Sequence, residues 1–357
     1  MSDLRRSFGA LLPHVGIYGG VRRFVEIGNE LVRCGHEFTL FTPSGEKPDW
    51  LEFKGRCGRL AELRDDEPAS GSSPSGGAPD ILMCGDTGLL DAMRRARARL
   101  KLMFVIGRRY ALKYARFLDC GFVLVGVSSD WKSYMSGADG YTIPGGVNLD
   151  LFRRSETVSE KSGESRLLTF GTPRKRVKGS VHVLRAYREL ARRAGAGQGI
   201  RSRLARLLSK KRAEFAVSLT LFDREPIELP GWARRLAVKT VVAPSQKELV
   251  ELYSRADIFI SCEESAGWCN SVAEAMACGT PVVCGPVGTV DVAEHEKTAL
   301  VVRPGDHKGI ADAVERLLGD VSLRESIARA AYEHVSAFSW QAFCRRLLAV
   351  VDEKLGA

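Results

Sequence analysis

The sequence predicts an α/β protein of two domains, each built on a parallel sheet. Its 357 residues are more than a single domain usually contains, so we expect two domains or so. In both halves, short apolar runs of strand length alternate with longer runs that have a helical apolar face. Strands separated by helical segments are joined by crossovers, and crossovers place the strands parallel in one sheet.

The first half shows this alternation up to about residue 150. A strand at 8–12 is followed by the glycine-rich loop 14–20 and by a helix that starts near Val21. That helix is expected to end at Gly35, because glycine readily takes the left-handed conformation of a helix cap. Further strands are expected at 36–41, 80–83, 101–106, 121–127 and 141–144. The segment 65–79 consists mostly of Ser, Gly, Pro and acidic residues, so we expect a flexible surface loop.

The second half repeats the pattern after the polar stretch 153–165, which has the composition of a linker. Strands are expected at 166–170, 215–222, 238–243, 257–261, 281–284 and 300–302. Helices are expected at 181–194, 246–256, 308–318, 322–337 and 340–354.

The composition is that of an ordinary globular protein, with 45% hydrophobic and 27% charged residues. No apolar run reaches the roughly 20 residues that cross a bilayer, so no membrane span is expected. The nine cysteines include no C-x-x-C pair and lie mostly in apolar runs, which indicates the reduced core residues of a cytoplasmic protein. The six histidines show no ligand spacing, so no metal is expected.

The formal net charge of +10 is concentrated in two places. One is 192–212, which has eight basic residues and no acidic one, and the other is 94–116. Such patches attract polyanions, although a solvated basic surface explains either of them equally well. A helix over 201–212 would have one apolar stripe, with cations on the rest of its surface. This pattern is found in helices that lie on anionic membranes, and also in helices that pack on a domain and expose a basic outer face. A peripheral contact with the inner face of the membrane therefore stays open, whereas no nucleic-acid motif is present.

The most informative stretch is 261–285, SCEESAGWCNSVAEAMACGTPVVCG. It indicates a turn that opens a short helix, with Glu274 in the first turn of that helix and a buried strand after a Gly-Thr-Pro break. Unpaired N–H groups and the dipole at a helix N-terminus attract phosphate. A carboxylate beside them can accept hydrogen bonds from a ribose diol. The helix N-terminus and the carboxylate together indicate a nucleotide-diphosphate site. The alternative is a capping box, in which Ser271 and Glu274 only satisfy the N–H groups of the helix start.

This stretch resembles the donor-binding motif of retaining glycosyltransferases with the GT-B fold, family-4 type (glycosyl transferases group 1). The matching residues are Gly267, Trp268, Glu274, Ala275, Met276, Ala277, Gly279, Thr280, Pro281, Val282 and Val283. Two positions depart from the family pattern. Ala266 stands where the first of two glutamates is usual, and Cys269 replaces the second glycine. Glu263 and Glu264 lie just upstream, and a shifted loop could bring one of them in.

The resemblance implies two facing Rossmann-like domains. Because 143–152 resembles the interdomain signature of the family, we expect an acceptor-side domain at 1–150 and a nucleotide-sugar-binding domain at 151–340. The final segment, 341–357, is expected to be a helix that returns to the first domain. The implied activity is retaining transfer of a sugar from a nucleotide-diphosphate donor to a glycan, a glycolipid or a small molecule, with no cofactor.

The resemblance also implies which residues meet the donor. In the basic loop 171–179, Lys178 and Arg174, or Arg176 in place of Arg174, would neutralise the diphosphate and stabilise the departing phosphate. Glu274 would hold the ribose. Backbone N–H groups toward the donor are expected from Gly16, Gly19, Gly20, Gly267, Trp268, Cys269 and Asn270.

A general base is harder to place. The family often has a histidine after the fourth or fifth strand of the first domain, and the segment 104–114 has none. Asp86 and Asp130 are the candidate helpers, and a front-face mechanism would not require a histidine. Two alternatives stay open. One is a non-catalytic partner subunit, which Ala266 favours, and the other is a nucleotide-sugar epimerase of the same fold.

Overall fold

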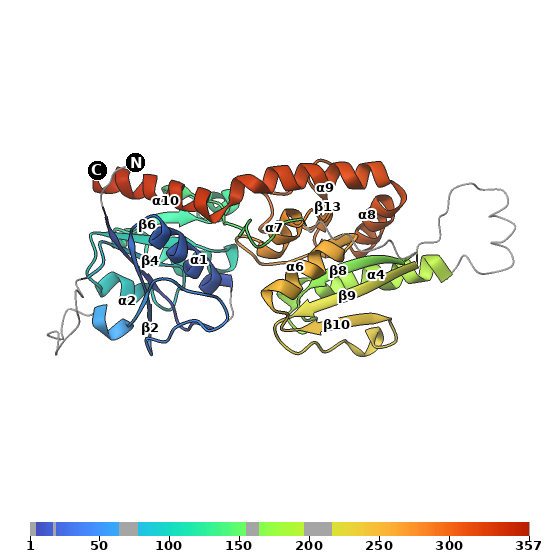
Figure 1. The fold of residues 1–357 in the computed structure, drawn as a ribbon, viewed down its shortest axis with the longest axis horizontal. Coiled ribbons are helices and arrows are strands. Elements are labelled where there is room, and N and C mark those ends of the chain that lie inside the picture. Colours follow the sequence, from blue (N-terminus) through green and yellow to red (C-terminus); the bar gives the residue numbers. More distant parts are fainter. Residues whose placement is uncertain (1–4, 17–18, 64–77, 155–163, 196–215, 357) are drawn as a thin grey trace, which may run out of the picture. The chain divides into compact units, whose positions relative to one another are not determined.

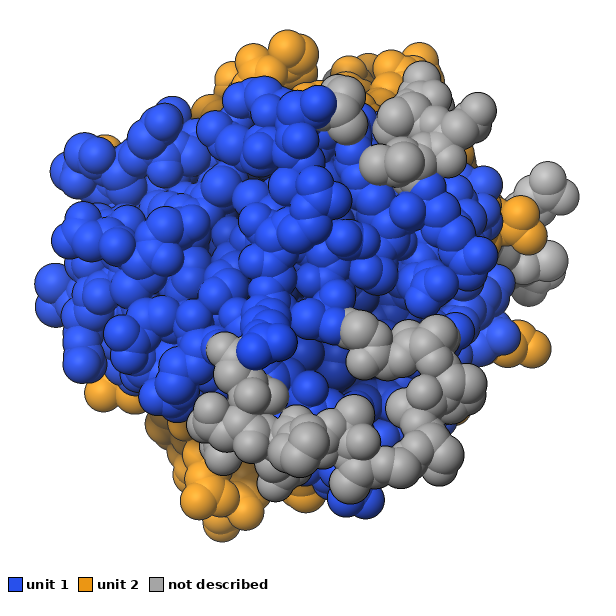
Figure 2. Space-filling model, turned by 90° about the vertical axis from the view of Figure 1, so that its left-hand side faces the viewer, with its two compact units in different colours: residues 1–146, 338–357 blue, residues 147–337 orange. Residues whose placement is uncertain are grey.

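The computed structural model describes residues 5–16, 19–63, 78–154, 164–195 and 216–356. Most of the predicted loop 65–79 and the amphipathic segment 201–212 lie outside these residues. The chain divides into two compact units, one formed by residues 1–146 with 338–357 and the other by 147–337 (Figure 2). Within the described ranges, no helix has the length and hydropathy needed to cross a bilayer.

Unit 1 is built on a seven-stranded sheet in the order β3-β2-β1-β4-β5-β6-β7, and each described pair of neighbouring strands is parallel. The strands are β1 (Ser7–Leu11), β2 (Glu37–Thr42), β3 (Arg56–Arg59), β4 (Ile81–Cys84), β5 (Leu100–Val105), β6 (Val123–Gly126) and β7 (Gly140–Thr142). Its α-helices are α1 (Gly19–Arg33), α2 (Leu90–Arg95), α3 (Ala111–Ala115) and α10 (Trp340–Leu355).

Helices cover both faces of this sheet. On one face, α2 and α3 share a core with the strands and with the fully buried Trp131. On the other face, the ring of Phe104 in β5 contacts Phe24 of α1 edge-on and stacks against Phe343 of α10. Figure 1 shows α10, the last helix of the chain, beside α1. The buried guanidinium of Arg6 forms an ion pair with Asp352, which ties α10 to the start of β1.

Unit 2 contains a six-stranded sheet in the order β10-β9-β8-β11-β12-β13, again with parallel neighbours. The strands are β8 (Glu164–Phe170), β9 (Ala216–Asp223), β10 (Val238–Val242), β11 (Ile258–Ser261), β12 (Val282–Cys284) and β13 (Leu300–Val301). The described α-helices are α4 (Ser180–Gly195), α6 (Gln246–Arg255), α7 (Asn270–Ala277), α8 (His307–Gly319) and α9 (Val321–Val335). A core of mostly aliphatic side chains joins α4 and α8 to the sheet (Figure 1). Helix α6 contacts β8, and α7 contacts β11 and β12.

Both sheets have the 3-2-1-4-5-6 strand order of doubly wound nucleotide-binding folds in their first six strands. The predicted fold class, α/β with two Rossmann-like domains, is confirmed. In this order the connections leave the sheet in opposite directions from two adjacent central strands, and ligands bind in the crevice between them at their carboxyl ends. In unit 1 that switch point lies between β1 and β4, and in unit 2 it lies between β8 and β11.

The sequence reading missed β3. This strand has the sequence Arg-Cys-Gly-Arg and forms the edge of the sheet, where only one of its four residues is buried. An exposed edge strand needs no apolar run, because main-chain hydrogen bonds to one neighbour hold it in place. Its partner is β2, with Leu40 opposite Cys57.

Candidate active site

The two loops at the switch point of unit 2 are fastened to each other. One, residues 171–179, follows β8, and the other, residues 262–269, follows β11. The N–H of Glu264 donates to the carbonyl of Val177 at 2.8 Å. Gly179 has a φ of +66°, and a Cβ at this position would lie 1.7 Å from the carbonyl oxygen of Cys262. Only glycine fits there, so this residue type is what lets the loops approach so closely.

An ion pair crosses the same junction. The ammonium Nζ of Lys178 lies 3.0 Å from Oε2 of Glu263, and the two side chains are 26% and 8% exposed. The ammonium also lies 4.8 Å from the centre of the Phe170 ring. A Cβ at Gly171 would come within 2.5 Å of the Lys178 Cβ, so this glycine makes room for the lysine stem. Lys178 is thus held at the carboxyl end of the sheet with part of its surface open to solvent.

The two candidate arginines of this loop are both exposed. Among the described residues, neither Arg174 nor Arg176 has a hydrogen-bond or ion-pair partner, whereas Lys175 between them pairs with Glu225 at 2.6 Å. Both guanidinium groups are therefore available to an anion, and Arg176 stays an alternative to Arg174.

Helix α7 begins at Asn270, with Cys269 as its N-cap. A capping box would require Ser271 at the N-cap position, and Ser271 is instead the second residue of the helix. The capping alternative for Ser271 and Glu274 is therefore wrong. The side chain of Cys269 makes no capping hydrogen bond, so α7 opens without the polar side chain that usually satisfies its first N–H groups.

The prediction that Glu274 lies in the first turn of the helix is wrong, because α7 begins at Asn270 and has no acidic residue in that turn. Glu274 is buried, and its carboxylate faces a phenol. The hydroxyl of Tyr253, in α6, donates to Oε2 of Glu274 at 3.1 Å. Burial, and then the neighbouring charge of Glu274, raise the pKa of Tyr253 well above its usual value. The phenol therefore stays protonated and remains a hydrogen-bond donor to the carboxylate at neutral pH.

The turn before α7 is packed tightly. Trp268 and Cys269 are both buried, and the N–H of Cys269 donates to the carbonyl of Gly288 at 2.8 Å. The sequence suggested this N–H as a contact to the donor, but in the structure it already has a partner. Burial, followed by the charge of Glu263, raises the pKa of the Cys269 thiol to about 11, so the thiol is protonated at neutral pH and is no thiolate nucleophile. Gly267 is buried and Asn270 is partly exposed.

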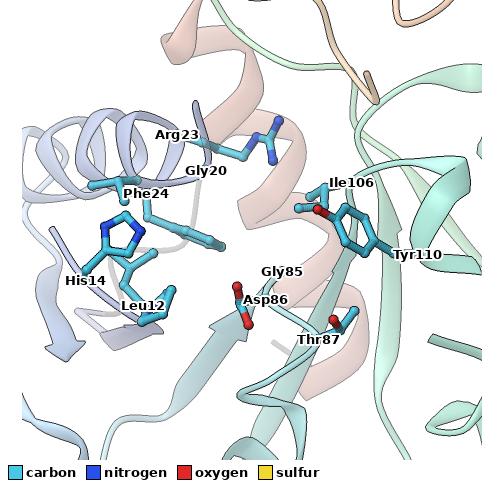
Figure 3. Close-up of a pocket in the computed structure, with 12 residues that line it drawn as sticks. Leu12, His14, Gly20, Arg23, Phe24, Gly85, Asp86, Thr87, Ile106 and Tyr110 are labelled. Carbon is cyan, nitrogen blue, oxygen red and sulfur yellow. The ribbon is translucent and has the colours of Figure 1, made fainter. Parts of the chain in front are cut away.

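A pocket lies at the corresponding place in unit 1. It is lined by residues that follow β1, β4 and β5 and by the first turns of α1. Figure 3 shows His14, Arg23, Asp86 and Tyr110 around one space, each from a different segment. Oδ1 of Asp86 accepts the N–H of Gly88 at 2.8 Å, which fixes the carboxylate at the end of β4.

The sequence-predicted residues of unit 1 fall partly into this pocket. Gly19 and Gly20 are the first two residues of α1, and Gly20 lines the pocket. Gly16 is exposed, and its N–H donates to Nδ1 of His14 at 3.1 Å. Of the two carboxylates suggested as helpers, Asp86 lines the pocket. Asp130 lies after β6 and is not part of the lining.

Comparison with known proteins supports this fold and gives a family match for unit 2. Residues 164–320, which carry every donor-site feature of unit 2, match the family described as glycosyl transferases group 1. D-inositol 3-phosphate glycosyltransferase of Saccharomonospora viridis is 29% identical over 226 residues, which cover 60% of this chain and 50% of that protein. The same enzyme of Corynebacterium aurimucosum is 41% identical over 121 residues, covering 32% of this chain and 28% of that protein. The chain thus spans about half the length, or less, of these relatives.

Several solved structures match nearly the whole chain, among them the two described next. Sucrose-phosphate synthase of Thermosynechococcus elongatus has a TM-score of 0.72 at 17% identity, covering 99% of this chain and all of that one. HepE of Anabaena, solved with UDP and glucose, has a TM-score of 0.71 at 13% identity, covering 98% of this chain and all of that one. The protein therefore has the GT-B fold of two Rossmann-like domains. The sequence of its second unit is similar to the group 1 glycosyltransferases over residues 164–320.

Sequence reasoning missed some residues of the site. It identified Lys178 and Glu274 but treated Glu263 only as a residue that a shifted loop could bring in, and it passed over Tyr253. Tyr253 lies on the buried face of α6, where its sequence spacing is that of a core residue. Asp86 was already one of the two candidate helpers, and in the structure it lines the pocket of unit 1.

Proposed function

We propose that the protein is a glycosyltransferase that moves a sugar from a nucleotide-diphosphate donor to an acceptor hydroxyl with retention of configuration. One observation carries the proposal. At the switch point of unit 2, the loop that carries the ammonium of Lys178 is joined by an ion pair and a backbone hydrogen bond to the loop that leads into α7, and α7 carries the buried carboxylate of Glu274. A cation with a helix N-terminus suits a diphosphate, and a carboxylate suits the diol of a ribose.

The chemistry follows from these charges. When the bond between the sugar and the phosphate breaks, the leaving nucleotide gains negative charge on its terminal phosphate. Lys178, with Arg174 or Arg176 from the same loop, would stabilise that charge. Glu274, fixed by Tyr253, would anchor the nucleoside so that the sugar end meets the lysine. The proposal assigns no step to a metal or a cofactor.

The nature of the two substrates is inferred from the relatives. HepE was solved with UDP and glucose, and the curated relatives are named for glycosyl transfer to an inositol phosphate. These names support a nucleotide sugar as donor and a glycan, a glycolipid or a small polyol as acceptor. A role in polysaccharide or glycolipid biosynthesis in the cytoplasm, with peripheral contact to an anionic membrane, belongs to the same proposal.

We place the acceptor in the pocket of unit 1. The pocket combines apolar walls from Leu12 and Phe24 with the polar groups of His14, Arg23 and Asp86, and a sugar or polyol presents both kinds of surface. Asp86 can accept a hydrogen bond from the attacking hydroxyl, a function that the missing histidine of segment 104–114 would otherwise supply.

The proposal is tested with a panel of nucleotide sugars in thermal-shift assays, followed by transfer assays on a polyol and glycan panel. A donor at 100 times its Kd stabilises the folded protein by about 2.7 kcal/mol. The variant Glu274→Gln should weaken donor binding by about tenfold or more, because a hydrogen bond to a charged group is worth about 1.5–3 kcal/mol. Glu251→Gln, a change in an exposed carboxylate of α6, should leave binding unchanged. Wild-type protein that is stabilised by no nucleotide sugar would refute the proposal.

One observation favours a second function, a partner subunit without turnover. Position 266 holds alanine, and a Cβ at Gly288 would lie 2.7 Å from the Cβ of Ala266, so the turn is packed around this small side chain. If the missing glutamate silences the enzyme, wild-type protein should bind donor without hydrolysis or transfer, and Ala266→Glu should create activity. A donor-isomerising epimerase is distinguished by incubating protein with donor alone and following the sugar by NMR.

A further inference from the structure

We propose that Tyr114 is a positioning residue, whose buried phenol sets the direction of the Asp86 carboxylate in the pocket of unit 1. The inference rests on the proposed transferase function and deepens it, because it identifies what holds the group that would assist the attacking hydroxyl. Tyr114, in α3, is not one of the residues that line the pocket, so its effect on the reaction passes through its neighbours.

The carboxylate of Asp86 belongs to a closed turn. Its Oδ1 accepts the N–H of Gly88 at 2.8 Å, and the backbone carbonyl of Asp86 accepts the N–H of Leu89 at 3.1 Å. A turn closed by both a side-chain and a main-chain hydrogen bond has little internal freedom. The direction of its carboxylate therefore depends on the residue before the turn, which is Gly85, directly after β4.

The phenol of Tyr114 holds this residue where the sheet no longer does. The parallel ladder between β4 and β5 ends at the pair Cys84 and Met103. Beyond that pair, the hydroxyl of Tyr114 donates to the carbonyl of Gly85 at 2.8 Å and accepts the N–H of Ile106 at 3.4 Å. A phenol can donate and accept at the same time. Because Gly85 and Ile106 both line the pocket, one hydroxyl bridges two of its walls.

Packing fixes the phenol itself. Tyr114 is fully buried in the core that α3 shares with the sheet, and its ring contacts the ring of Tyr110 edge-on, with 6.4 Å between ring centres. Burial raises the pKa of Tyr114 well above its usual value, so the hydroxyl keeps its proton and remains a donor at neutral pH. Water does not reach this bond, and its loss is therefore not made good by solvent.

A second contact at the turn is weaker. The thiol of Cys84 donates to the carbonyl of Asp86, with Sγ 3.4 Å from the oxygen. A thiol is a weak hydrogen-bond donor, whereas a phenol is a strong one. The bond from Tyr114 to Gly85 is thus the firmer of the two. Its value for the reaction lies in the geometry of Asp86, because misplacing a reacting group by about 1 Å can cost roughly a hundredfold in rate.

The first test removes the hydroxyl and keeps the ring. Sugar transfer by Tyr114→Phe is measured with UDP-glucose or GDP-mannose as donor, at saturation, and with D-inositol 3-phosphate or the best acceptor of a polyol and glycan panel varied. We expect kcat/KM for the acceptor to fall by about threefold to tenfold, mostly through kcat, because a hydrogen bond of about 1 kcal/mol no longer directs the carboxylate.

Thr142→Val is the matched control. Thr142 Oγ1 accepts the indole N–H of the fully buried Trp131 at 2.9 Å, and Trp131 belongs to the same core as Tyr114. Neither residue lines the pocket. The control also loses a hydrogen bond of this core, so its unfolding free energy should fall, while kcat/KM should stay within about twofold of wild type.

A double-mutant cycle separates positioning from a general loss of stability. Tyr114→Phe is made again in the Asp86→Asn background. If the phenol acts through the carboxylate, the second change should cost less than about twofold there, because both changes remove the same contribution. A purely structural role would give the same loss in both backgrounds.

Amide hydrogen exchange examines the turn without any substrate. In Tyr114→Phe the N–H groups of Gly88 and Leu89 should exchange about tenfold faster than in wild-type protein, because the turn opens more easily once Gly85 is released. Exchange in β2 should stay unchanged, and Thr142→Val should leave both segments as they are in wild type.

Three results would overturn the inference. They are an unchanged kcat/KM in Tyr114→Phe, an equal loss with and without the Asp86 carboxylate, and unchanged exchange of the Gly88 and Leu89 N–H groups. In each of these cases wild-type protein still transfers the sugar, so the proposed function survives. Wild-type protein that transfers no sugar would refute the proposed function and, with it, a role of Tyr114 in the reaction.

Discussion

The phenol of Tyr253 and the carboxylate of Glu274 form a buried hydrogen bond of 3.1 Å between α6 and α7. Tyr253 is itself enclosed by aromatic rings, with Phe259 at 5.3 Å and Phe222 at 5.8 Å between ring centres, both edge-on. Its position is therefore fixed by packing that is independent of Glu274. The rigid phenol sets the direction of the carboxylate that we propose to bind the ribose.

The variant Tyr253→Phe should keep this packing and remove the hydrogen bond. The change leaves a buried carboxylate with one donor fewer, which should lower the free energy of unfolding by about 1–3 kcal/mol. Affinity for the donor should fall by roughly threefold to tenfold, because Glu274 is no longer held in one direction. Denaturant unfolding and calorimetry measure the two effects.

Tyr187→Phe is the matched control, since this tyrosine also donates through its hydroxyl, to the carbonyls of Val217 and Ala237 in another part of unit 2. It should lose stability without losing donor affinity. If Tyr253→Phe binds the donor as tightly as wild-type protein, the phenol does not position Glu274 for binding.

Gly179 is the residue on which the junction of the two loops depends. A Cβ there would lie 1.7 Å from the carbonyl oxygen of Cys262, and backbone atoms cannot yield as a flexible side chain can. Gly179→Ala should force the loops apart and cost about 3 kcal/mol or more, beyond the roughly 1 kcal/mol of a left-handed alanine. Donor binding should be lost with it.

Gly305→Ala provides the comparison for this prediction. Gly305 has a φ of +76°, close to that of Gly179, but the nearest atom to its added Cβ is 3.7 Å away, in His182. This variant carries the conformational strain without the clash. Similar losses of unfolding free energy in the two variants would show that strain, and not the closeness of the loops, explains the effect.

The parts of the fold with regular apolar patterns could be predicted from the sequence. The buried strands β4 and β11 and the helices α8 and α10 appear as apolar periodicities, because their burial determines the residue types. The exposed edge strand β3 has no such pattern. The order of strands in a sheet depends on contacts between distant segments, and no single segment of the sequence determines it. The sequence could therefore place Lys178 and Glu263 on separate loops without showing that these loops meet.

Site residues could be predicted only where they belong to a recognisable local sequence motif. Glu274 and the loop of Lys178 stand in motifs of local sequence. The contacts of Glu263 and Tyr253 are made with residues 85 and 21 positions away, respectively. Contacts of that sequence separation follow from packing of the sheet, which local spacing does not encode. The same holds for Asp86, whose pocket is formed by segments between residues 12 and 110.

Lys178→Gln should separate diphosphate binding from nucleoside binding. The variant loses the charge that we propose to stabilise the leaving phosphate, so the transfer rate kcat should fall at least a hundredfold. Affinity for UDP should fall more than affinity for uridine monophosphate, because the ribose contact through Glu274 remains. Stability should also drop, since Glu263 is left buried without its cation.

Lys175→Gln is the control for charge alone, because Lys175 pairs with the exposed Glu225. It removes the same charge from the same loop and should reduce kcat less than threefold. Equal effects of the two variants would show that the loop acts through its overall charge, and the specific role of Lys178 would be wrong.

Asp86→Asn tests the acceptor site in unit 1. Asparagine keeps an Oδ1 for the N–H of Gly88, so the turn after β4 should stay intact, while the charge that would attract the proton of the acceptor hydroxyl is lost. We expect kcat/KM for the acceptor to fall by about tenfold to a hundredfold, since general acid–base assistance is commonly worth a hundredfold or more. Donor affinity and the free energy of unfolding should change little.

Asp130→Asn, a change in the carboxylate that lies outside the pocket, should leave kcat/KM within about threefold of wild type. Steady-state kinetics with acceptor varied at saturating donor distinguishes the two variants, and a larger loss in Asp130→Asn than in Asp86→Asn would move the acceptor away from this pocket.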